Sequence, residues 1–227
     1  SSVSHDFRTP LTTIIGAASS LRDRAAAFTP AGRRDLLTTI QESGERLHRY
    51  VVNLLNTSRI EAGALPLNRD WVDIGEPVST ALNHLAPASA RGRIVLDLPR
   101  ELPMIEVDFV LMEQVILNLL DNAVKYSPAG TPIRVSARDE PDRLVLEVTN
   151  AVTAPPLDLD RVFERFYRQD ARIGAEGTGL GLSICKGFVE VMGGTIAARG
   201  SASSVTISVT FPVTATARRF AAELADE

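Results

Sequence analysis

Two patterns of apolar residues divide the chain. Up to about residue 62, apolar residues recur at the spacing of helices that bury one face. Thr29 followed by Pro30 is typical of an N-cap and first turn, so it predicts where a second helix begins, and Gly63 predicts where that helix ends. The apolar stripes are Phe7, Leu11, Ile14, Ile15, Ala18 and Leu21, then Leu36, Leu37, Ile40, Gly44, Leu47, Val51, Leu55 and Ser58.

Two amphipathic helices joined in this way form a hairpin that cannot bury both apolar stripes by itself. Pairing with a second copy of the chain, to give a four-helix bundle, would bury them. We therefore expect a homodimer that forms through residues 1–64.

The pattern changes after Pro66, where short strand-like runs are mixed with helical stretches. Strands are expected at residues 93–98, 133–138, 144–149 and 205–211, and helices at residues 77–88, 109–126 and 180–192. These elements lack the strict repeat of a parallel α/β fold, so the expected fold class is α+β, with an α/β sandwich over residues 65–215. Residues 63–73 are expected to connect the two parts, and residues 216–227 form a tail without an assigned function.

Composition is that of an ordinary soluble globular protein, with 44% hydrophobic and 23% charged residues. The net charge of −4 argues against a nucleic-acid-binding surface.

Cys185 is the only cysteine, which excludes a disulfide framework and fits a reducing cytosol. No apolar run reaches the roughly 18 residues of a membrane helix. Because the chain opens without Met, we expect a fragment of a longer protein.

Chemically suggestive residues lie near the start of the first helix. Asp6 can hydrogen bond to one ring nitrogen of His5, which would fix the tautomer and make the other nitrogen more nucleophilic. Thr9 follows one turn later on the same face, and Pro10 removes a backbone donor close to His5. An exposed imidazole beside a carboxylate suits attack on a phosphate. An isolated His-Asp pair, however, is more often a surface histidine beside an aspartate that caps the helix.

A second group lies within residues 109–126. Asn118 and Asn122 are one helical turn apart and point the same way, with Lys125 close by. Carboxamide oxygens suit Mg²⁺, which also binds phosphates, and Lys125 supplies positive charge for the same phosphates. An amphipathic helix explains the apolar residues of this stretch but not the spaced asparagines.

A third group is a glycine-rich run that leads into a helix. Glycines let a ligand approach the backbone, and a helix N-terminus offers N–H groups to an anion. The run matches neither a P-loop nor a dinucleotide-binding fingerprint. Residues 161–168 include the aromatic residues Phe163, Phe166 and Tyr167. Between them and the run lies a polar stretch, residues 169–176, which we interpret as a lid over a nucleotide. The run consists of Gly177, Thr178, Gly179, Leu180 and Gly181.

The string from Ser4 to Leu11 resembles the phosphoacceptor box of sensor histidine kinases. The resemblance implies that His5 is the phosphoacceptor and that Asp6 is its general base. It also implies that Thr9 positions water for dephosphorylation of a partner, the receiver domain of a response regulator.

The later groups resemble the asparagine, phenylalanine and second glycine boxes of the ATP-binding domain that histidine kinases share with gyrase, Hsp90 and MutL. Residues 108–114 and 184–190 look most similar to KdpD-type kinases, which govern potassium uptake. The resemblance implies ATP and Mg²⁺ as cofactors and a membrane-anchored parent with this part in the cytoplasm. It assigns Mg²⁺ to Asn118, phosphate contacts to Asn122, Lys125 and Tyr126, and the γ-phosphate to Arg168.

One box departs from the family pattern. Before Pro155 the family carries Asp-x-Gly-x-Gly, whose Asp binds the adenine amino group, but residues 149–153 read Thr-Asn-Ala-Val-Thr. Counting back from the prolines places Thr149 at the Asp position, whereas strand alternation favours Asn150, the preferred reading. Losing the carboxylate would cost about 1 kcal/mol, and losing the glycines more. A loss of about 3 kcal/mol weakens binding more than a hundredfold.

Three functions remain to be compared. The first is an autokinase that phosphorylates His5 and then a response regulator. The second is a nucleotide-impaired pseudokinase that binds the regulator and promotes its dephosphorylation through Thr9, or a kinase that prefers guanine because Asn150 can also donate. The third is a DNA-acting relative of gyrase or MutL. It conflicts with the net negative charge of the chain and leaves the His5 box without a role.

Overall fold

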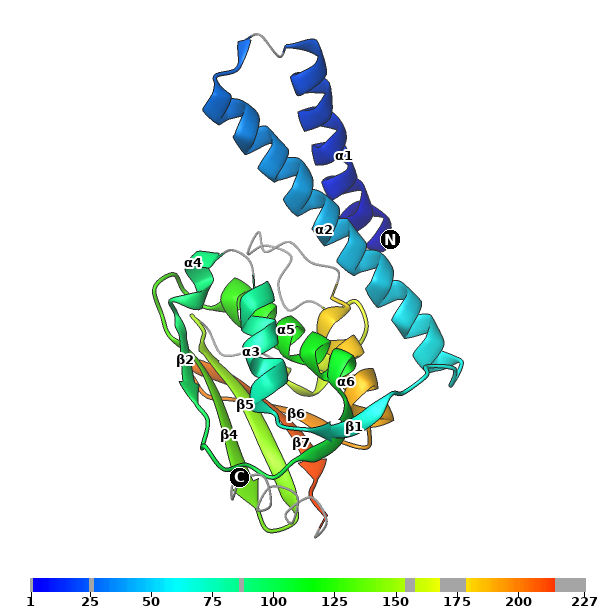
Figure 1. Ribbon diagram of the computed structural model, residues 1–227, viewed down its shortest axis with the longest axis vertical. Coiled ribbons are helices and arrows are strands. Elements are labelled where there is room, and N and C mark those ends of the chain that lie inside the picture. The colour runs from blue at the N-terminus through cyan, green and yellow to red at the C-terminus, as the bar shows by residue number, and fades with distance from the viewer. Residues whose placement is uncertain (1, 25–26, 86–87, 154–157, 168–178, 215–227) are drawn as a thin grey trace. The chain divides into compact units, whose positions relative to one another are not determined.

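The computed structural model describes residues 2–24, 27–85, 88–153, 158–167 and 179–214 (Figure 1). The chain divides into two compact units, the first ending at Ala62 and the second beginning at Gly63. Among the described helices, none combines the length and the apolar character that crossing a membrane requires.

The first unit is a hairpin of two helices, α1 (Ser2–Asp23) and α2 (Pro30–Glu61). The expected boundaries of α2 are confirmed. Thr29 Oγ1 accepts a hydrogen bond from Gly32 N at 3.1 Å, with Pro30 in the first turn. Gly63, just past the end of α2, has a φ of +61°, a backbone conformation that favours glycine.

Part of the apolar surface of the hairpin is packed and part is exposed. Phe7 of α1 packs edge-to-face on Tyr50 of α2, with ring centroids 5.9 Å apart, and Ala17 is buried. Six large apolar side chains keep 42% to 57% of their surface exposed: Leu11, Ile15, Leu37, Val51, Leu54 and Leu55. The hairpin alone therefore leaves much of both stripes in contact with water.

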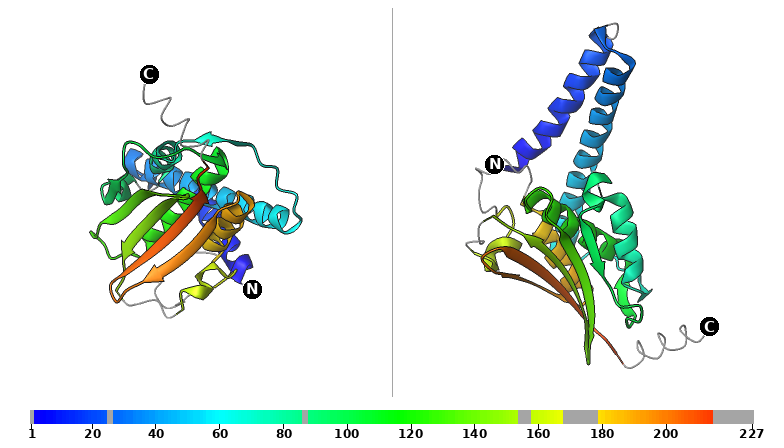
Figure 2. Two further views of the ribbon diagram at one scale, coloured as in Figure 1. Left: turned by 90° about the horizontal axis from the view of Figure 1, so that it is seen from below. Right: turned by 90° about the vertical axis from the view of Figure 1, so that its left-hand side faces the viewer.

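The second unit is an α/β sandwich. Its main sheet has the strand order β2-β4-β5-β7-β6, in which β2 pairs parallel with β4 and the other pairs are antiparallel. Helices α3, α5 and α6 cover one face of this sheet (Figures 1 and 2). The helices are α3 (Gly75–His84), α4 (Ala88–Arg91), α5 (Phe109–Tyr126) and α6 (Gly181–Val191), with a 3₁₀ turn η2 (Asp160–Phe163). The strands are β1 (Arg69–Val72), β2 (Ile94–Asp97), β3 (Ile105–Asp108), β4 (Ile133–Glu140), β5 (Arg143–Ala151), β6 (Thr195–Gly200) and β7 (Ser204–Pro212).

The core of this unit lies between the main sheet and its helices. Leu144, Leu146 and Val148 of β5 are almost fully buried. Each such side chain stabilises the fold by about 1.5–3 kcal/mol. The helices contribute Met112, Ile116, Leu119 and Leu120 from α5, and Ile184 and Phe188 from α6.

The α+β class and the expected strands and helices are confirmed within a few residues, but two expectations are wrong in part. The expected helix at residues 77–88 ends at His84, because Leu85 is extended, and α4 is separate. The expected connecting segment, residues 63–73, contains β1, which pairs with β3 in a separate two-stranded sheet. Strands β3 and β6 were also missed.

Asp108 explains why β1 belongs to the second unit. Its Oδ1 accepts from Leu111 N at 3.1 Å and so caps α5, while its Oδ2 accepts from Asn68 N at 2.9 Å, just before β1. One buried carboxylate thus satisfies two backbone donors that are far apart in the chain.

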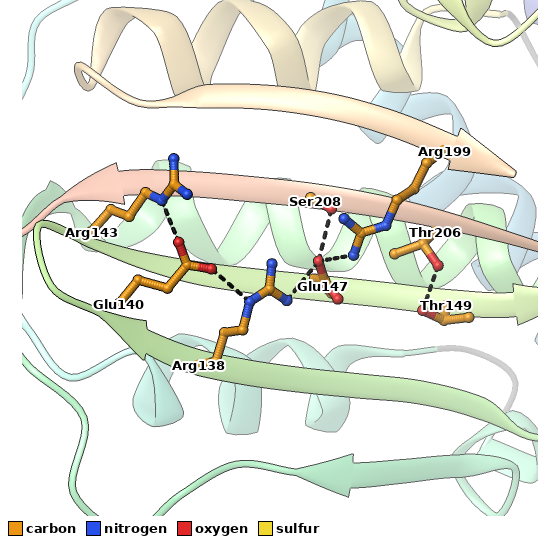
Figure 3. Close-up of polar contacts among 8 residues, drawn as sticks. All are labelled: Arg138, Glu140, Arg143, Glu147, Thr149, Arg199, Thr206 and Ser208. Atoms are coloured by element: carbon orange, nitrogen blue, oxygen red, sulfur yellow. Dashed lines mark hydrogen bonds and ion pairs between the residues drawn. The ribbon is translucent and has the colours of Figure 1, made fainter.

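Polar side chains cross the other face of the main sheet (Figure 3). The side chain of Glu147 accepts from Arg138 at 2.8 Å and from Ser208 at 3.1 Å, and it also pairs with Arg199. Burial alone raises the pKa of Glu147 and is the largest single effect. The hydrogen bonds from Arg138 and Ser208, with the charges of Arg138 and Arg199, outweigh it, so the pKa is lowered.

The lowered pKa of Glu147 predicts an acid-sensitive contribution to stability. The contribution is fully present above about pH 4.3, the ordinary pKa of an unfolded glutamate, and is lost as the pH falls through the lower folded-state pKa. In urea unfolding between about pH 7 and about pH 3, the native chain should exceed Glu147→Gln in stability at neutral pH, and the difference should narrow in acid. A difference that stays constant with pH would contradict this.

Candidate functional site

The first group of predicted site residues lies on α1. The helix includes His5 and Asp6, whose side chains are outside the described part of the structure. Thr9 is half-buried, and its carbonyl accepts from Thr13 Oγ1 at 3.1 Å. Pro10 lies inside α1 without ending it. The helical position of the box is therefore described, whereas the contact between His5 and Asp6 is not.

The second group lies on α5, as expected. Its apolar face is buried in the core, and Asn118, Asn122 and Lys125 lie off that face with part of their surface accessible. Lys125 Nζ is 5.0 Å from the ring centroid of Tyr126. The two asparagines and Lys125 thus share one region of a single rigid helix, where carboxamide groups and a positive charge are available together.

The start of α6 lies against this polar region of α5 (Figure 1). A Cβ added to Gly181 would lie 3.4 Å from Asn122 Nδ2, and Cys185 Sγ is 3.7 Å from the carbonyl oxygen of Val115. Gly181 and Cys185 are one turn apart on α6. The N-terminal turn of α6, where backbone N–H groups lack partners within the helix, is therefore next to Asn122.

Cys185 lies at the contact between α5 and α6. Burial raises the pKa of its thiol to about 12, so the group stays protonated at neutral pH. Asn118 Nδ2 is shielded from solvent and has no hydrogen-bond partner within the described residues. Sequence reasoning missed the burial of both groups, because it follows from the packing of two helices that are far apart in the chain.

The structure brings together two residues that the sequence separates, Phe166 and Gly179. Phe166 N donates to Gly179 O at 3.0 Å. Gly179 has a φ of +68°, and a Cβ there would lie 2.8 Å from the carbonyl carbon of Phe166. Phe166 itself has a φ of +61°, which is uncommon for a residue with a side chain. The expected lid lies between these two residues.

The remaining residues of the glycine-rich run are only partly described. Leu180 is buried and its carbonyl accepts from Ile184 N at 3.0 Å, which begins α6. Arg168, Gly177, Thr178 and the expected lid at residues 169–176 lie outside the described residues.

In the box that departs from the family pattern, Asn150 and Thr149 lie on opposite faces of β5. The Thr149 hydroxyl is 2.8 Å from that of Thr206 on the face shown in Figure 3. Asn150 is 8% exposed and lies on the helix-covered face. Its Nδ2 donates to the Ala151 carbonyl at 2.9 Å. Of the two alignments, only the one that uses Asn150 places a carboxamide on the same side as α5 and α6.

The segment that lacks the family's glycines begins at the end of β5. Strand β5 pairs with β7 as far as Ala151 and Ser204, and Val152 N then donates to Ser203 O at 2.9 Å. The turn between β6 and β7 is held by Ser201, whose Oγ accepts from Ser204 N at 3.1 Å. Backbone and side-chain hydrogen bonds thus fix both segments at this edge of the sheet.

The donor set fits a magnesium–phosphate ligand better than a metal held by protein alone. No group of three His, Cys, Asp or Glu side chains that could hold a metal occurs in the described residues. Mg²⁺ needs few protein ligands when phosphates and water supply the rest. The carboxamides of α5 and the glycine-led start of α6 provide oxygen ligands and anion-binding N–H groups for such a ligand.

Comparison with known proteins agrees with this arrangement. Residues 1–63 match the His Kinase A (phospho-acceptor) domain, and residues 107–215 match the histidine kinase-, DNA gyrase B- and HSP90-like ATPase family. The sensor protein KdpD of Escherichia coli strain K12 is 39% identical over 198 residues, which is 86% of this chain and 22% of KdpD. The chain thus spans less than a quarter of that relative.

Solved structures resemble the chain over most of its length. The histidine kinase AdeS of Acinetobacter baumannii has a TM-score of 0.69 at 25% identity, covering 92% of this chain and 98% of AdeS. Full-length ShkA in complex with AMPPNP has a TM-score of 0.66 at 26% identity, covering 93% of this chain and 45% of ShkA. Both domain families occur in the order of a kinase core, and the fold agrees along both units, so the chain belongs to the sensor histidine kinases.

Proposed function

We propose that this chain is a kinase core that moves the γ-phosphoryl group of ATP to His5 and then to an aspartate of a response regulator. The observation that carries the proposal is the pairing of the Asn118–Asn122 face of α5 with the glycine-led start of α6, in a chain that also has a histidine box on a helical hairpin. The related ShkA was solved in complex with AMPPNP, which supports a nucleotide ligand for this chain.

The roles of the nucleotide-site residues follow from their chemistry. Asn118 holds Mg²⁺ through its carboxamide oxygen, and Asn122, Lys125 and Tyr126 contact the phosphates. The backbone of residues 177–181 approaches the phosphates, and Arg168 stabilises the charge of the transferring group. Mg²⁺, when bound, neutralises charge on the phosphates.

Asn150 can accept a hydrogen bond from adenine. One of its two amide N–H groups donates to the Ala151 carbonyl, and its Oδ1 can accept a hydrogen bond from a base. The adenine amino group would donate to that oxygen, whereas the guanine carbonyl would have to use the second N–H group. An uncharged acceptor binds more weakly than a carboxylate, so ATP affinity is expected to be lower than in relatives with Asp.

In the proposed phosphoryl transfer, His5 is the nucleophile and Asp6 is the base. A ring nitrogen of His5 forms a bond to the γ-phosphorus as the bond to the bridging oxygen of ADP breaks, and Asp6 takes the proton from the other ring nitrogen. A carboxylate oxygen of a regulator aspartate then forms a bond to the phosphorus on His5 as the P–N bond breaks, and the imidazole of His5 is released. Thr9 positions water for the later removal of phosphate from the regulator.

The exposed apolar surface of the hairpin supports a homodimer. The six exposed side chains named above lie on both α1 and α2, and a second hairpin would cover them in a four-helix bundle. The proposed units are a dimerisation and phosphotransfer hairpin at residues 1–64, an ATP-binding domain at residues 65–215 and a tail at residues 216–227. The parent protein is proposed to be membrane-anchored, with this core in the cytoplasm.

A labelling experiment tests the proposal. The chain is incubated with γ-labelled ATP with and without Mg²⁺, and the label is then challenged with acid and with alkali. We expect Mg²⁺-dependent label that acid removes and alkali does not, because a phosphoramidate bond behaves in this way. Absence of label with either ATP or GTP, together with dephosphorylation of a phosphorylated receiver domain, would instead identify a nucleotide-impaired regulator phosphatase.

A further inference from the structure

Arg93 holds the loop that joins α5 to β4. It lies between α4 and β2, and its side chain is partly buried. Its Nε donates to Thr131 O at 2.9 Å, and its Nη2 donates to Pro128 O at 3.0 Å and to the Ser127 hydroxyl. Its own carbonyl accepts from Ile133 N at 2.9 Å, where β4 begins. One residue from another part of the chain therefore fixes both ends of residues 127–133.

The same loop begins where the residues proposed to contact the phosphates end. Lys125 and Tyr126 are the last two residues of α5, with Lys125 Nζ 5.0 Å from the Tyr126 ring centroid, and Ser127 follows as the C-cap. Ser127 N donates to Ala123 O at 3.1 Å and closes the last turn. The last turn of a helix has carbonyls without helical partners and frays easily, so its geometry depends on how the next residues are held. The Arg93 guanidinium also places a positive charge at this C-terminus, where the helix dipole favours it.

We propose that Arg93 is a positioning residue for Lys125 and Tyr126, because by holding Ser127 and the loop it keeps the last turn of α5 closed, so that both side chains face the phosphates of ATP. This inference rests on the proposed function, which assigns phosphate contacts to those two residues. Arg93 acts through the loop and not by binding the nucleotide itself, since its Nε and Nη2 are engaged by loop oxygens. Asn150, the proposed adenine contact, belongs to β5 and not to this loop. The effect of Arg93 is therefore confined to the phosphates.

The test compares a ligand that carries phosphates with one that lacks them. ATP affinity is measured by calorimetry with Mg²⁺, and adenosine affinity by NMR titration, which also reports weak binding. Arg93→Met keeps the length of the side chain but removes its donors. We expect it to lower ATP affinity about tenfold, because a hydrogen bond to a charged group contributes at least that much. Adenosine affinity should stay unchanged, whereas a merely structural role of Arg93 would lower both affinities together.

Arg91→Met is the matched control. Arg91 lies two positions earlier and also donates to backbone carbonyls, from Nη2 to Asn83 O at 2.5 Å and from Nε to Leu85 O at 3.4 Å, but these carbonyls belong to the end of α3. The variant should lower the free energy of unfolding without changing the ratio of ATP affinity to adenosine affinity. If Arg91→Met and Arg93→Met change this ratio alike, Arg93 has only a structural role and the inference is wrong.

Ser127→Ala removes a single one of these hydrogen bonds and tests the route through the loop. Alone it should cause part of the loss of ATP affinity, and added to Arg93→Met it should have little further effect, because the bond is already absent. Effects that add in full would overturn the inference. Gly130→Ala strains the same loop at a φ of +78° but removes none of these hydrogen bonds, so it should keep its ATP affinity. A loss equal to that of Arg93→Met would also contradict the proposed role.

A last measurement needs no nucleotide. In Arg93→Met, the backbone amide of Ser127 should exchange with water faster than in Arg91→Met, which is destabilised at another loop. Equal exchange in these two variants would overturn the inference. A native chain that binds ATP no better than adenosine would overturn the proposed function and with it this inference, whereas a preference for ATP that Arg93→Met leaves intact would overturn this inference alone.

Discussion

His5→Gln abolishes the incorporation of label from γ-labelled ATP and, as a consequence, all transfer to a receiver domain. The imidazole is the nucleophile of the proposed step, and a glutamine carboxamide cannot take its place. Glutamine is a good helix former, so α1 should persist. Nucleotide affinity, measured by calorimetry, should stay unchanged because His5 belongs to the hairpin and not to the nucleotide site.

The other two histidines provide matched controls for this result. His48 is exposed on α2, and His84 ends α3 with its Nδ1 2.7 Å from Glu113. His48→Gln should keep full labelling, and His84→Gln should lose only the stability that its hydrogen bond to Glu113 contributes, about 1 kcal/mol. Label that persists in His5→Gln but disappears in one of these variants would place the acceptor elsewhere.

Gly179→Ala reduces both nucleotide affinity and the labelling rate by about a hundredfold. An added Cβ would lie 2.8–3.0 Å from backbone atoms of Phe166 and Tyr167, and these atoms cannot move aside as a side-chain end would. A left-handed φ adds about 1–2 kcal/mol for a residue with a Cβ. Together these effects should exceed about 3 kcal/mol, so the variant should leave the native conformation at Gly179. Recovering that conformation when nucleotide binds would cost the same free energy, which corresponds to the hundredfold loss. Calorimetry and the initial rate of labelling are the measurements.

Gly130→Ala separates the two causes. Gly130 also has a positive φ, +78°, but nothing lies within 4 Å of an added Cβ. Backbone strain alone should therefore lower the free energy of unfolding of this variant by about 1–2 kcal/mol. Its nucleotide affinity should stay unchanged. If Gly179→Ala and Gly130→Ala lose the same amount of both properties, the contact between Gly179 and Phe166 has no particular role in the site.

Local signals in the sequence were sufficient for most elements. The Thr29-Pro30 cap and Gly63 predicted the limits of α2, and the apolar period predicted α5 with its observed bounds. These features depend on residues within a few positions of one another, because capping and helical periodicity are local properties. The motif strings likewise indicated the family without knowledge of the fold.

Strand β1 shows where local reasoning failed. Four residues are too few to establish a two-residue period, and the strand exists because it pairs with β3 and because Asp108 holds the backbone at Asn68. A segment that reads as a linker therefore became part of the ATP-binding unit. The helix expected at residues 77–88 was likewise interrupted at Leu85, within an apolar stretch that by itself continues the pattern.

The sequence by itself determined the two-part organisation, the helical hairpin and the identity of the chemical groups on α1, α5 and the glycine-rich run. Only the tertiary structure decided which of Thr149 and Asn150 lies on the helix-covered face, that Phe166 meets Gly179, and that Cys185 lies against Val115. The physical reason is that these relations join groups on different elements. Their distances depend on how helices and strands pack, and no spacing along the chain encodes that packing.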